Sequence, residues 1–472
     1  MSADTQGVSG AALENAHAVF RRWLGDSYDT DALDVVLATA ACEQLDGDPV
    51  WLLVISGSGN AKTETVVALA GIGATIVSTI ASEGALLSGT SRKERSEEAT
   101  GGLLRKMGDR GIIVIKDVTS ILSMSGDQRA SVLGALREVY DGAWSRNVGT
   151  DGGQTLEWSG RLVTIGAVTT AWDKAHAVIA SMGDRFVLVR MDSTTGRRSA
   201  GRQAIGNTGH EDEMRAELTG AVSTLMGTIN TTGIAVTDAE TDVLLAAADL
   251  VTLARTAVER DYRGDVIDAH APEMPTRFAK QLTQIVRGAV AIGIDRTAAL
   301  RLAIRCARDS MAPIRLHIID DVSAHPGSST SDVRKRLGMP RATIDRELQA
   351  LHMLNVLSVE ESDGINGGRD VTIWRYTLQD GIEPHALDPQ KVVPDSALPV
   401  PPPVKVVPET AVPTQPLVKG QGALGVPTAE SGTKTGETAC TICAQELWSP
   451  ASIALGICGK TDAAHVAAKA TA

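Results

Sequence analysis

An apolar run followed directly by a glycine-bearing loop with a lysine most limits how this chain can fold. Residues Trp51–Ile55 are apolar, residues 56–63 read Ser-Gly-Ser-Gly-Asn-Ala-Lys-Thr, and a helical pattern begins at Glu64. A strand that leads through such a loop into a helix directs backbone N–H groups and a helix N-terminus at one point, where phosphate binds. Lys62 would then reach the β- and γ-phosphates, and Thr63 would ligate Mg²⁺. The residues predicted to bind the nucleotide are Gly57, Ser58, Gly59, Asn60, Ala61, Lys62 and Thr63.

The loop lies in a region where short apolar runs alternate with helical patterns. Such alternation indicates an α/β fold with a largely parallel sheet. Residues 193–208 are polar and contain glycine, which predicts a loop, and residues 209–318 have an almost continuous helical pattern. The apolar runs predicted to form strands are residues 50–55, 74–80, 111–115, 161–165 and 186–189.

A second apolar run, Gly111–Ile115, ends close to the carboxylate of Asp117. An aspartate at a strand end holds Mg²⁺ through its water shell. Together the two segments resemble the Walker A and Walker B motifs of P-loop nucleotidases, although Ser56 and Ala61 stand where that family has glycine. The resemblance implies ATP and Mg²⁺ as cofactors, with Thr63 and Asp117 on the side of the metal.

A hydrolytic glutamate does not follow the Walker B aspartate, because Val118 stands after Asp117 where most AAA+ ATPases have glutamate. Glu83 follows the strand after the loop helix, where RecA-like helicases carry their catalytic glutamate, and it is the first candidate. Glu64, directly after Thr63, is the alternative. A solvated acid without a catalytic role is a further interpretation of Glu83.

The next segment resembles, in the order of its elements, enhancer-binding ATPases and minichromosome maintenance helicases of the AAA+ class. In those proteins a helix, a β-hairpin and a sensor-1 strand follow one another, and residues 150–153 (Thr-Asp-Gly-Gly) have the turn chemistry of a hairpin tip. The resemblance implies that Thr169 or Thr170 faces the γ-phosphate. It also implies that Arg185 reaches a neighbouring subunit, so that the active form is a homo-oligomer, and that Arg277 is the cis arginine of the lid.

Residues 319–380 carry the pattern of a winged helix-turn-helix. A capped helix closes at Gly338, Pro340 starts a second helix, and two β-prone segments flank a glycine-rich turn at 363–368. In this arrangement the second helix enters the major groove of DNA and basic side chains contact phosphates. Contact with another protein is the alternative role of such a module. The residues predicted to contact DNA are Arg334, Lys335, Arg336, Arg341, Thr343, Arg346 and Arg369.

A proline-rich stretch and a cysteine cluster follow. The composition changes after Asp380, and the stretch from Pro394 to Pro416 is dense in proline, which predicts an extended linker over residues 381–436. Two thiolates on a Cys-x-x-Cys turn and two ligands from a returning loop form a tetrahedral zinc site. The predicted Cys₃His ligands are Cys440, Cys443, Cys458 and His465. Asp462 competes as a ligand, and a tail with stray cysteines and no metal is the alternative.

Composition narrows the class of protein. The chain has 472 residues, 43% of them hydrophobic, and a formal net charge of -12, so any DNA contact needs a local basic patch. No run of about 18 apolar residues is present, and 5 Cys without a disulfide framework indicate a reducing compartment. The protein is therefore expected in the cytoplasm, without a membrane partner. The predicted segments are 1–47 (N-terminal helices), 48–200 (nucleotide-binding domain), 201–318 (helical lid), 319–380 (winged helix), 381–436 (linker) and 437–472 (zinc-binding tail).

These features predict an α/β P-loop protein that binds ATP, hydrolyses it and acts on DNA as a helicase-like, loader or remodelling protein. A winged-helix transcription regulator, whose P-loop domain senses nucleotide without hydrolysis, is the alternative from another class. A DNA-repair or phage-type replication protein of the RecA-like helicase class is the third hypothesis.

Overall fold

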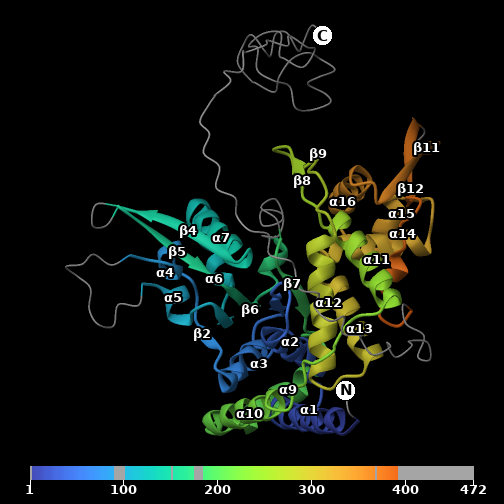
Figure 1. Ribbon diagram of the computed structural model, residues 1–472. Helices are drawn as coiled ribbons and strands as arrows, with labels where there is room; N and C mark the ends of the chain where they lie inside the picture. Colours follow the sequence, from blue (N-terminus) through green and yellow to red (C-terminus); the bar gives the residue numbers. More distant parts are fainter. Residues whose placement is uncertain (1–2, 90–100, 150–152, 175–183, 367–368, 392–472) are drawn as a thin grey trace, which may run out of the picture. The chain divides into compact units, whose positions relative to one another are not determined.

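A parallel sheet occupies the centre of the computed structural model (Figure 1). All of the described residues belong to one compact unit within Met1–Lys405. The described residues are 3–89, 101–149, 153–174, 184–366 and 369–391.

The sheet has five strands, and each neighbouring pair in it is parallel. The α/β fold with a parallel sheet that the alternating pattern predicted is therefore confirmed. The strands, in spatial order, are β2 (Thr75–Val77), β3 (Arg110–Ile115), β6 (Arg161–Val168), β1 (Trp51–Ile55) and β7 (Val187–Arg190).

Strand β1 is buried along its whole length, because it lies between β6 and β7 and both of its faces are covered. Alternate side chains of a strand point to opposite faces. Leu52 and Val54 accordingly belong to one hydrophobic core, and Trp51, Leu53 and Ile55 to another. A continuous apolar run is thus what this position in a parallel sheet requires.

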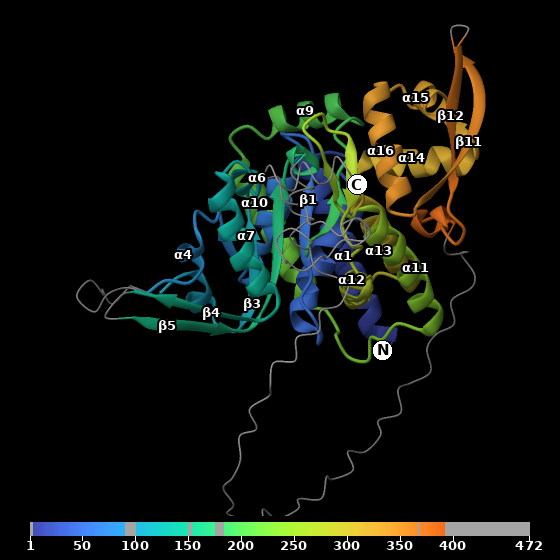
Figure 2. The ribbon, with the colours of Figure 1, turned by 90° about the horizontal axis from the view of Figure 1, so that it is seen from above.

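Helices cover both faces of the sheet (Figures 1 and 2). The core with Trp51 is closed by α7 (Gly126–Tyr140) and by the antiparallel hairpin of β4 (Ala143–Val148) and β5 (Gln154–Ser159). The core with Leu52 is closed by a helical layer that includes α2, α12 and α13. The bounds of the helices on this side are α1 (Ala3–Leu24), α2 (Thr30–Ala41), α3 (Lys62–Val67), α10 (Glu211–Met226), α11 (Asp238–Ala254), α12 (Thr276–Ala291) and α13 (Arg296–Asp309).

Short helices connect the strands at the β2 side of the sheet. Capping by Ser82, whose hydroxyl accepts from the N–H of Ala85 at 3.3 Å, begins the first of them. They are α4 (Glu83–Leu86), α5 (Leu103–Met107) and α6 (Thr119–Leu122).

The last described segment contains the helices and hairpin expected there. A capping box of Ser329 and Asp332 begins α15, and Gly338, at φ 65°, ends it. A sheet of order β10-β12-β11 combines the short strand before α15 with the hairpin after α16. The elements are α14 (Pro313–Ala324), β10 (Ser328–Ser329), α15 (Thr330–Leu337), α16 (Arg341–Met353), β11 (Leu357–Asn366) and β12 (Arg369–Leu378).

Two segments differ from the sequence-based expectation. Residues 193–208, expected as a loop, contain α9 (Arg197–Gly206); this helix buries none of its side chains, so it has no apolar periodicity to reveal it. The nearly continuous helical pattern of 209–318 is interrupted by a hairpin of β8 (Val258–Arg260) and β9 (Val266–Ala269).

Within the described ranges, no helix is both long enough and apolar enough to cross a lipid bilayer.

Gly288 allows α12 to pack closely against α2. A Cβ added there would lie 2.1 Å from the carbonyl oxygen of Ala38, whereas a Cβ at Gly220 of α10 would meet nothing within 4 Å. We expect Gly288→Ala to lower the free energy of unfolding by about 1–3 kcal/mol, because the two helices must move apart. Gly220→Ala, the matched control, should raise it by about 0.5–1 kcal/mol. Urea denaturation followed by circular dichroism measures both, and equal effects would contradict this role of Gly288.

Candidate functional site

The glycine-bearing loop lies at the carboxyl end of the central strand. Ser56 continues β1, its N–H donating to the carbonyl of Val168 in β6 at 3.3 Å. Gly59 and Ala61 both have left-handed backbone conformations, at φ 76° and 55°, and α3 begins at the next residue. The strand, loop and helix therefore follow one another as predicted.

Lys62 is a buried cation at this edge. The residue is 9% exposed, and its Nζ donates a hydrogen bond to the carbonyl of Gly57 at 3.0 Å. Burial lowers the pKa of Lys62, and the negative charge of Asp117 opposes that shift. The lysine that the sequence predicted to bind phosphate is thus within electrostatic range of the predicted magnesium-side carboxylate.

Asp117 lies just beyond the end of β3, two strands from β1. Its Oδ1 accepts a hydrogen bond from the N–H of Thr119 at 2.9 Å. The hydroxyls of Thr119 and Thr169 are 3.4 Å apart, and Thr169 follows β6. Lys62, Asp117 and Thr169 therefore occupy the same edge of three neighbouring strands, while Thr63 is exposed at the start of α3.

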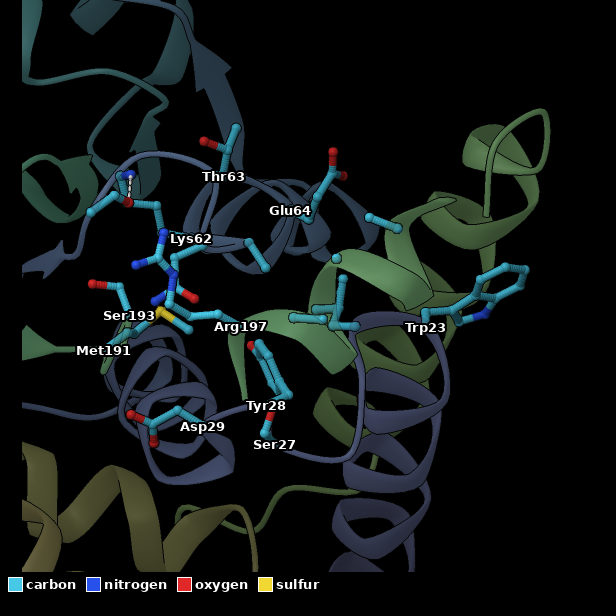
Figure 3. A pocket seen from close by; sticks show the side chains of 18 of the residues that line it. Trp23, Ser27, Tyr28, Asp29, Lys62, Thr63, Glu64, Met191, Ser193 and Arg197 are labelled. Carbon is cyan, nitrogen blue, oxygen red and sulfur yellow. Dashed lines mark hydrogen bonds between the residues drawn. The ribbon is translucent and has the colours of Figure 1, made fainter. Parts of the chain in front are cut away.

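A cavity of about 760 Å³ opens beside the loop (Figure 3). Pockets of about 300–1,000 Å³ accommodate small organic ligands and cofactors. Its walls come from the loop, from the end of α1 and the segment up to Asp29, from the segment after β7, from one side of α9 and from the start of α10. The glycine-bearing loop is therefore one wall of a cavity that the sequence did not predict.

Tyr28 fastens the loop helix to the wall of this cavity. Its hydroxyl and that of Thr65 are 2.7 Å apart, and Thr65 also donates to the carbonyl of Ala61 at 3.1 Å. Burial raises the pKa of Tyr28, so the phenol is neutral. On the other side of the loop, the Asn60 amide donates to the carbonyl of Asp192 at 2.9 Å.

Acidic groups of the cavity already have partners. Both oxygens of Asp29 bind the Arg305 guanidinium, at 2.9 and 2.5 Å. Glu64, the alternative catalytic acid, forms a two-point pair with Arg215 of α10, at 3.1 and 3.0 Å. The cavity wall is thus partly assembled by charge-assisted hydrogen bonds.

Glu83 lies away from the lysine and is bound to the hairpin. Its carboxylate accepts from Arg146 of β4 at 2.5 Å and from the Ser131 hydroxyl of α7 at 2.9 Å. Arg146 also donates to the carbonyl of Leu87 at 2.9 Å. In this structure Glu83 therefore joins α4 to α7 and β4, and it makes no contact with Lys62 or Asp117.

The two arginines expected at the phosphates lie at the other edge of the sheet. Arg185 precedes β7 and pairs with Asp141 at 2.9 Å, and Arg277 donates to the carbonyl of Asp184 at 3.2 Å. The amino and carboxyl edges are about 13 Å apart along β1, at about 3.3 Å per residue. The structure therefore does not bring Arg277 to Lys62 of its own chain.

The predicted DNA contacts divide into exposed and paired side chains. Arg336 binds the buried carboxylate of Asp321 at 2.8 and 2.7 Å. Arg346 pairs with Asp265 in the turn between β8 and β9 at 3.2 Å and also donates to the carbonyl of Arg263. These two arginines hold the helices in place.

The other predicted DNA contacts have no ion pair within the described residues. Lys335, Arg341 and Thr343 are exposed, and Arg334 is half-buried. The side chain of Arg369 lies outside the described residues. The strand β11 of the hairpin carries Glu360, Glu361 and Asp363, whereas α15 and the first turn of α16 carry Arg334, Lys335 and Arg341.

The predicted zinc ligands of the tail lie beyond the described residues. Cys440, Cys443, Cys458 and His465 are all in that part of the chain. In the described part, no cluster of His, Cys, Asp and Glu is arranged to hold a metal ion.

Comparison with known proteins adds little. No family model matches the chain, and no curated protein matches it. A solved structure, the A form apo structure of the NrS-1 C-terminal region, has a TM-score of 0.22 and 10% sequence identity over 77% of this chain and 75% of that chain. A likeness of this degree supports no inference about function.

Ala61 occupies a backbone conformation that glycine adopts freely. Left-handed backbone costs an L-residue roughly 1–2 kcal/mol, so we expect Ala61→Gly to raise the free energy of unfolding by up to about 1 kcal/mol. Ala130→Gly, in an exposed part of α7, should instead lower it by about 1 kcal/mol. Urea denaturation of both variants tests this, and a destabilised Ala61→Gly variant would show that the methyl group packs favourably.

Proposed function

We propose that this chain binds and hydrolyses a nucleoside triphosphate, ATP in the first instance, and acts on DNA. The observation that carries the proposal is that Lys62 and Asp117 follow β1 and β3 at the same edge of the sheet, where Lys62 lines a cavity of about 760 Å³. A buried cation whose one hydrogen bond among the described residues is to a loop carbonyl is electrostatically suited to an anionic ligand.

The residues divide the task of holding the ligand. Backbone N–H groups of the loop and the start of α3 face the phosphate oxygens. Lys62 exchanges the carbonyl of Gly57 for a phosphate oxygen, and its positive charge offsets the negative charge of the phosphates. The Thr63 hydroxyl and Asp117 would hold Mg²⁺, which supplies charge neutralisation at the β- and γ-phosphates when bound. Thr169 stands beside them as a hydroxyl donor.

A nucleotide-sensing regulator without hydrolysis is the second candidate. It is favoured by the contacts of Glu83, which is held by Arg146 and Ser131. Glu64 is likewise held by Arg215. Neither acid is free to orient a water molecule unless these pairs open. A RecA-like mechanism would require that opening at Glu83.

For DNA binding, the proposed surface is α15 with the first turn of α16. Lys335 and Arg341 are exposed there, and Arg334 is close to them in sequence. The helix order and the hairpin support a winged helix-turn-helix, in which such residues contact phosphates. A helicase, loader or remodelling role is the finer form of this proposal.

Assembly and zinc binding are further parts of the proposal. A homo-oligomer would let Arg185, which precedes β7, reach a neighbour's phosphates after release from Asp141. Cys440, Cys443, Cys458 and His465 would form the zinc site, and ATP and Mg²⁺ would be the other cofactors.

Removal of the two central charges separates binding from hydrolysis. We expect Lys62→Ala to weaken binding of Mg·ATP by about 10- to 100-fold, the loss of one charge-assisted hydrogen bond of about 1.5–3 kcal/mol. Asp117→Asn should retain binding and lose turnover. Isothermal titration calorimetry and a phosphate-release assay, with and without single- and double-stranded DNA, measure these effects.

The matched control is Lys280→Ala, an exposed lysine that pairs with Asp48 at 2.9 Å near the amino edge of the sheet. It should bind ATP as the wild type does. Absence of ATP binding by the wild type would refute the proposal, and ATP binding without turnover under any DNA condition would favour the regulator.

DNA affinity distinguishes exposed from structural arginines. Arg341→Ala should weaken binding to duplex DNA and reduce the slope of log K against log salt by about 1. Arg336→Ala should mainly lower the free energy of unfolding, by about 1–3 kcal/mol, because the buried Asp321 loses its partner. Fluorescence anisotropy across a salt series and urea denaturation test the pair. An unchanged salt slope in Arg341→Ala would exclude this residue from a phosphate contact.

A further inference from the structure

Arg197 is a cation at the cavity that has no role in the site as described so far. It begins α9 and lines the cavity, and it extends toward the loop that carries Lys62 (Figure 3). Within the described part of the chain it makes no hydrogen bond and no ion pair. An arginine presents five donors in a planar fork that matches phosphate oxygens.

The approach to Arg197 is fastened to the phosphate loop. Asn60 donates to the carbonyl of Asp192 at 2.9 Å, and a Cβ added at Gly57 would lie 3.1 Å from the Ser193 hydroxyl. Asp192 then closes a turn by accepting from the N–H groups of Thr194 and Thr195, at 2.7 and 3.1 Å. The segment that delivers Arg197 therefore runs alongside the loop at contact distance.

The helix itself is fixed at both ends. Gly196, at φ 65°, precedes α9 and lies so close to Ser27 that an added Cβ would be 2.1 Å from its hydroxyl. At the other end, Gln203 donates to the carbonyl of Arg22 at 3.0 Å, and Asn207 donates to the carbonyl of Trp23 at 2.7 Å. Because α9 is anchored on the last turn of α1 and on Ser27 after it, the start of α9 at Arg197 is held at the cavity in the absence of ligand.

One side of α9 is shaped to approach a ligand. The cavity-lining positions after Arg197 are Ala200, Gly201 and Ala204, all small residues. Arg198 and Arg202 do not line the cavity. The helix therefore presents one arginine and a row of small side chains to the cavity.

Competing acids at the cavity are already occupied. Asp29 is paired with Arg305, Glu64 with Arg215, and Asp192 accepts the hydrogen bonds of its own turn. Glu211 accepts from the N–H of Gly209 at 2.9 Å. Arg197 is thus available for an external anion.

We propose that Arg197 binds the phosphate chain of the nucleotide as a second cation opposite Lys62, the cis arginine of this site. The inference rests on the proposed function, and it assigns to α9 the role that the sequence pattern had suggested for Arg277. It further predicts that binding is dominated by phosphate contacts, so that a ligand without a base is also recognised.

Affinity measurements with two ligands test this proposal. Mg·ATP and inorganic tripolyphosphate are titrated by calorimetry into the full-length wild type, Arg197→Ala, Arg197→Lys and Arg202→Ala. Arg202, on the same helix and outside the cavity, is the matched control for charge. We expect Arg197→Ala to weaken both ligands by about 10- to 100-fold, Arg197→Lys to weaken them less, and Arg202→Ala to change them by less than about twofold.

Each of the other results would refute either the role of Arg197 or the proposed function. Tight ATP binding by Arg197→Ala, together with its loss in Lys62→Ala, would refute the role of Arg197 and leave the proposed function intact. If Arg197→Ala bound ATP more weakly but tripolyphosphate with unchanged affinity, Arg197 would contact the nucleoside, and its role as a phosphate ligand would be refuted. An equal loss of affinity in Arg202→Ala would show that the effect comes from net charge, and it would refute a direct contact by Arg197. A wild type that binds neither ligand would refute both proposals, and thermal melting of each variant confirms that the comparison is between folded proteins.

Discussion

The position of β1 in the middle of a parallel sheet is the constraint on which the rest of the site depends. Its residues are excluded from water on both faces, so the strand cannot shift without moving two hydrophobic cores. The loop that leaves its carboxyl end is therefore held at a fixed height above the sheet. At this position the negative charge of Asp117, which follows β3, acts on Lys62.

Contacts from distant parts of the chain then hold the loop from several sides. Tyr28 comes from before the strand, Asp192 from after the last strand, and Arg215 from α10. None of these contacts uses the atoms that would face phosphate. The loop can therefore keep Ala61 in a left-handed conformation, because the cost of one strained residue is small compared with the burial of the strand that precedes it.

The sequence predicted the features that local patterns determine, and it did not predict the features that depend on residues distant along the chain. The strands were predictable because continuous burial demands continuous apolar residues, as in Trp51–Ile55. Helix α9 was not, because a helix that buries nothing has no period to detect. Glu83 was placed by its distance along the chain from the loop, but its partner Arg146 is 63 residues away and no local pattern reports it. Arg277 does open an amphipathic helix, yet a helix pattern does not specify which edge of a sheet the helix start approaches.

The same reasoning connects the cavity to the module at the end of the described chain. Asp29 in the cavity wall binds Arg305 of α13, and three residues further along α13 Arg308 binds Asp320 of α14 at 2.6 Å. The next residue, Asp321, is the partner of Arg336 in α15. Salt bridges and two rigid helices thus form an unbroken connection from the cavity to helix α15. Such a connection transmits a change only if one of its members has two stable arrangements. The exposed pairs are the weakest links, and the Arg308 side chain is 33% exposed while Asp321 is buried. The ion pair between α13 and α14 is therefore the weakest point of this connection.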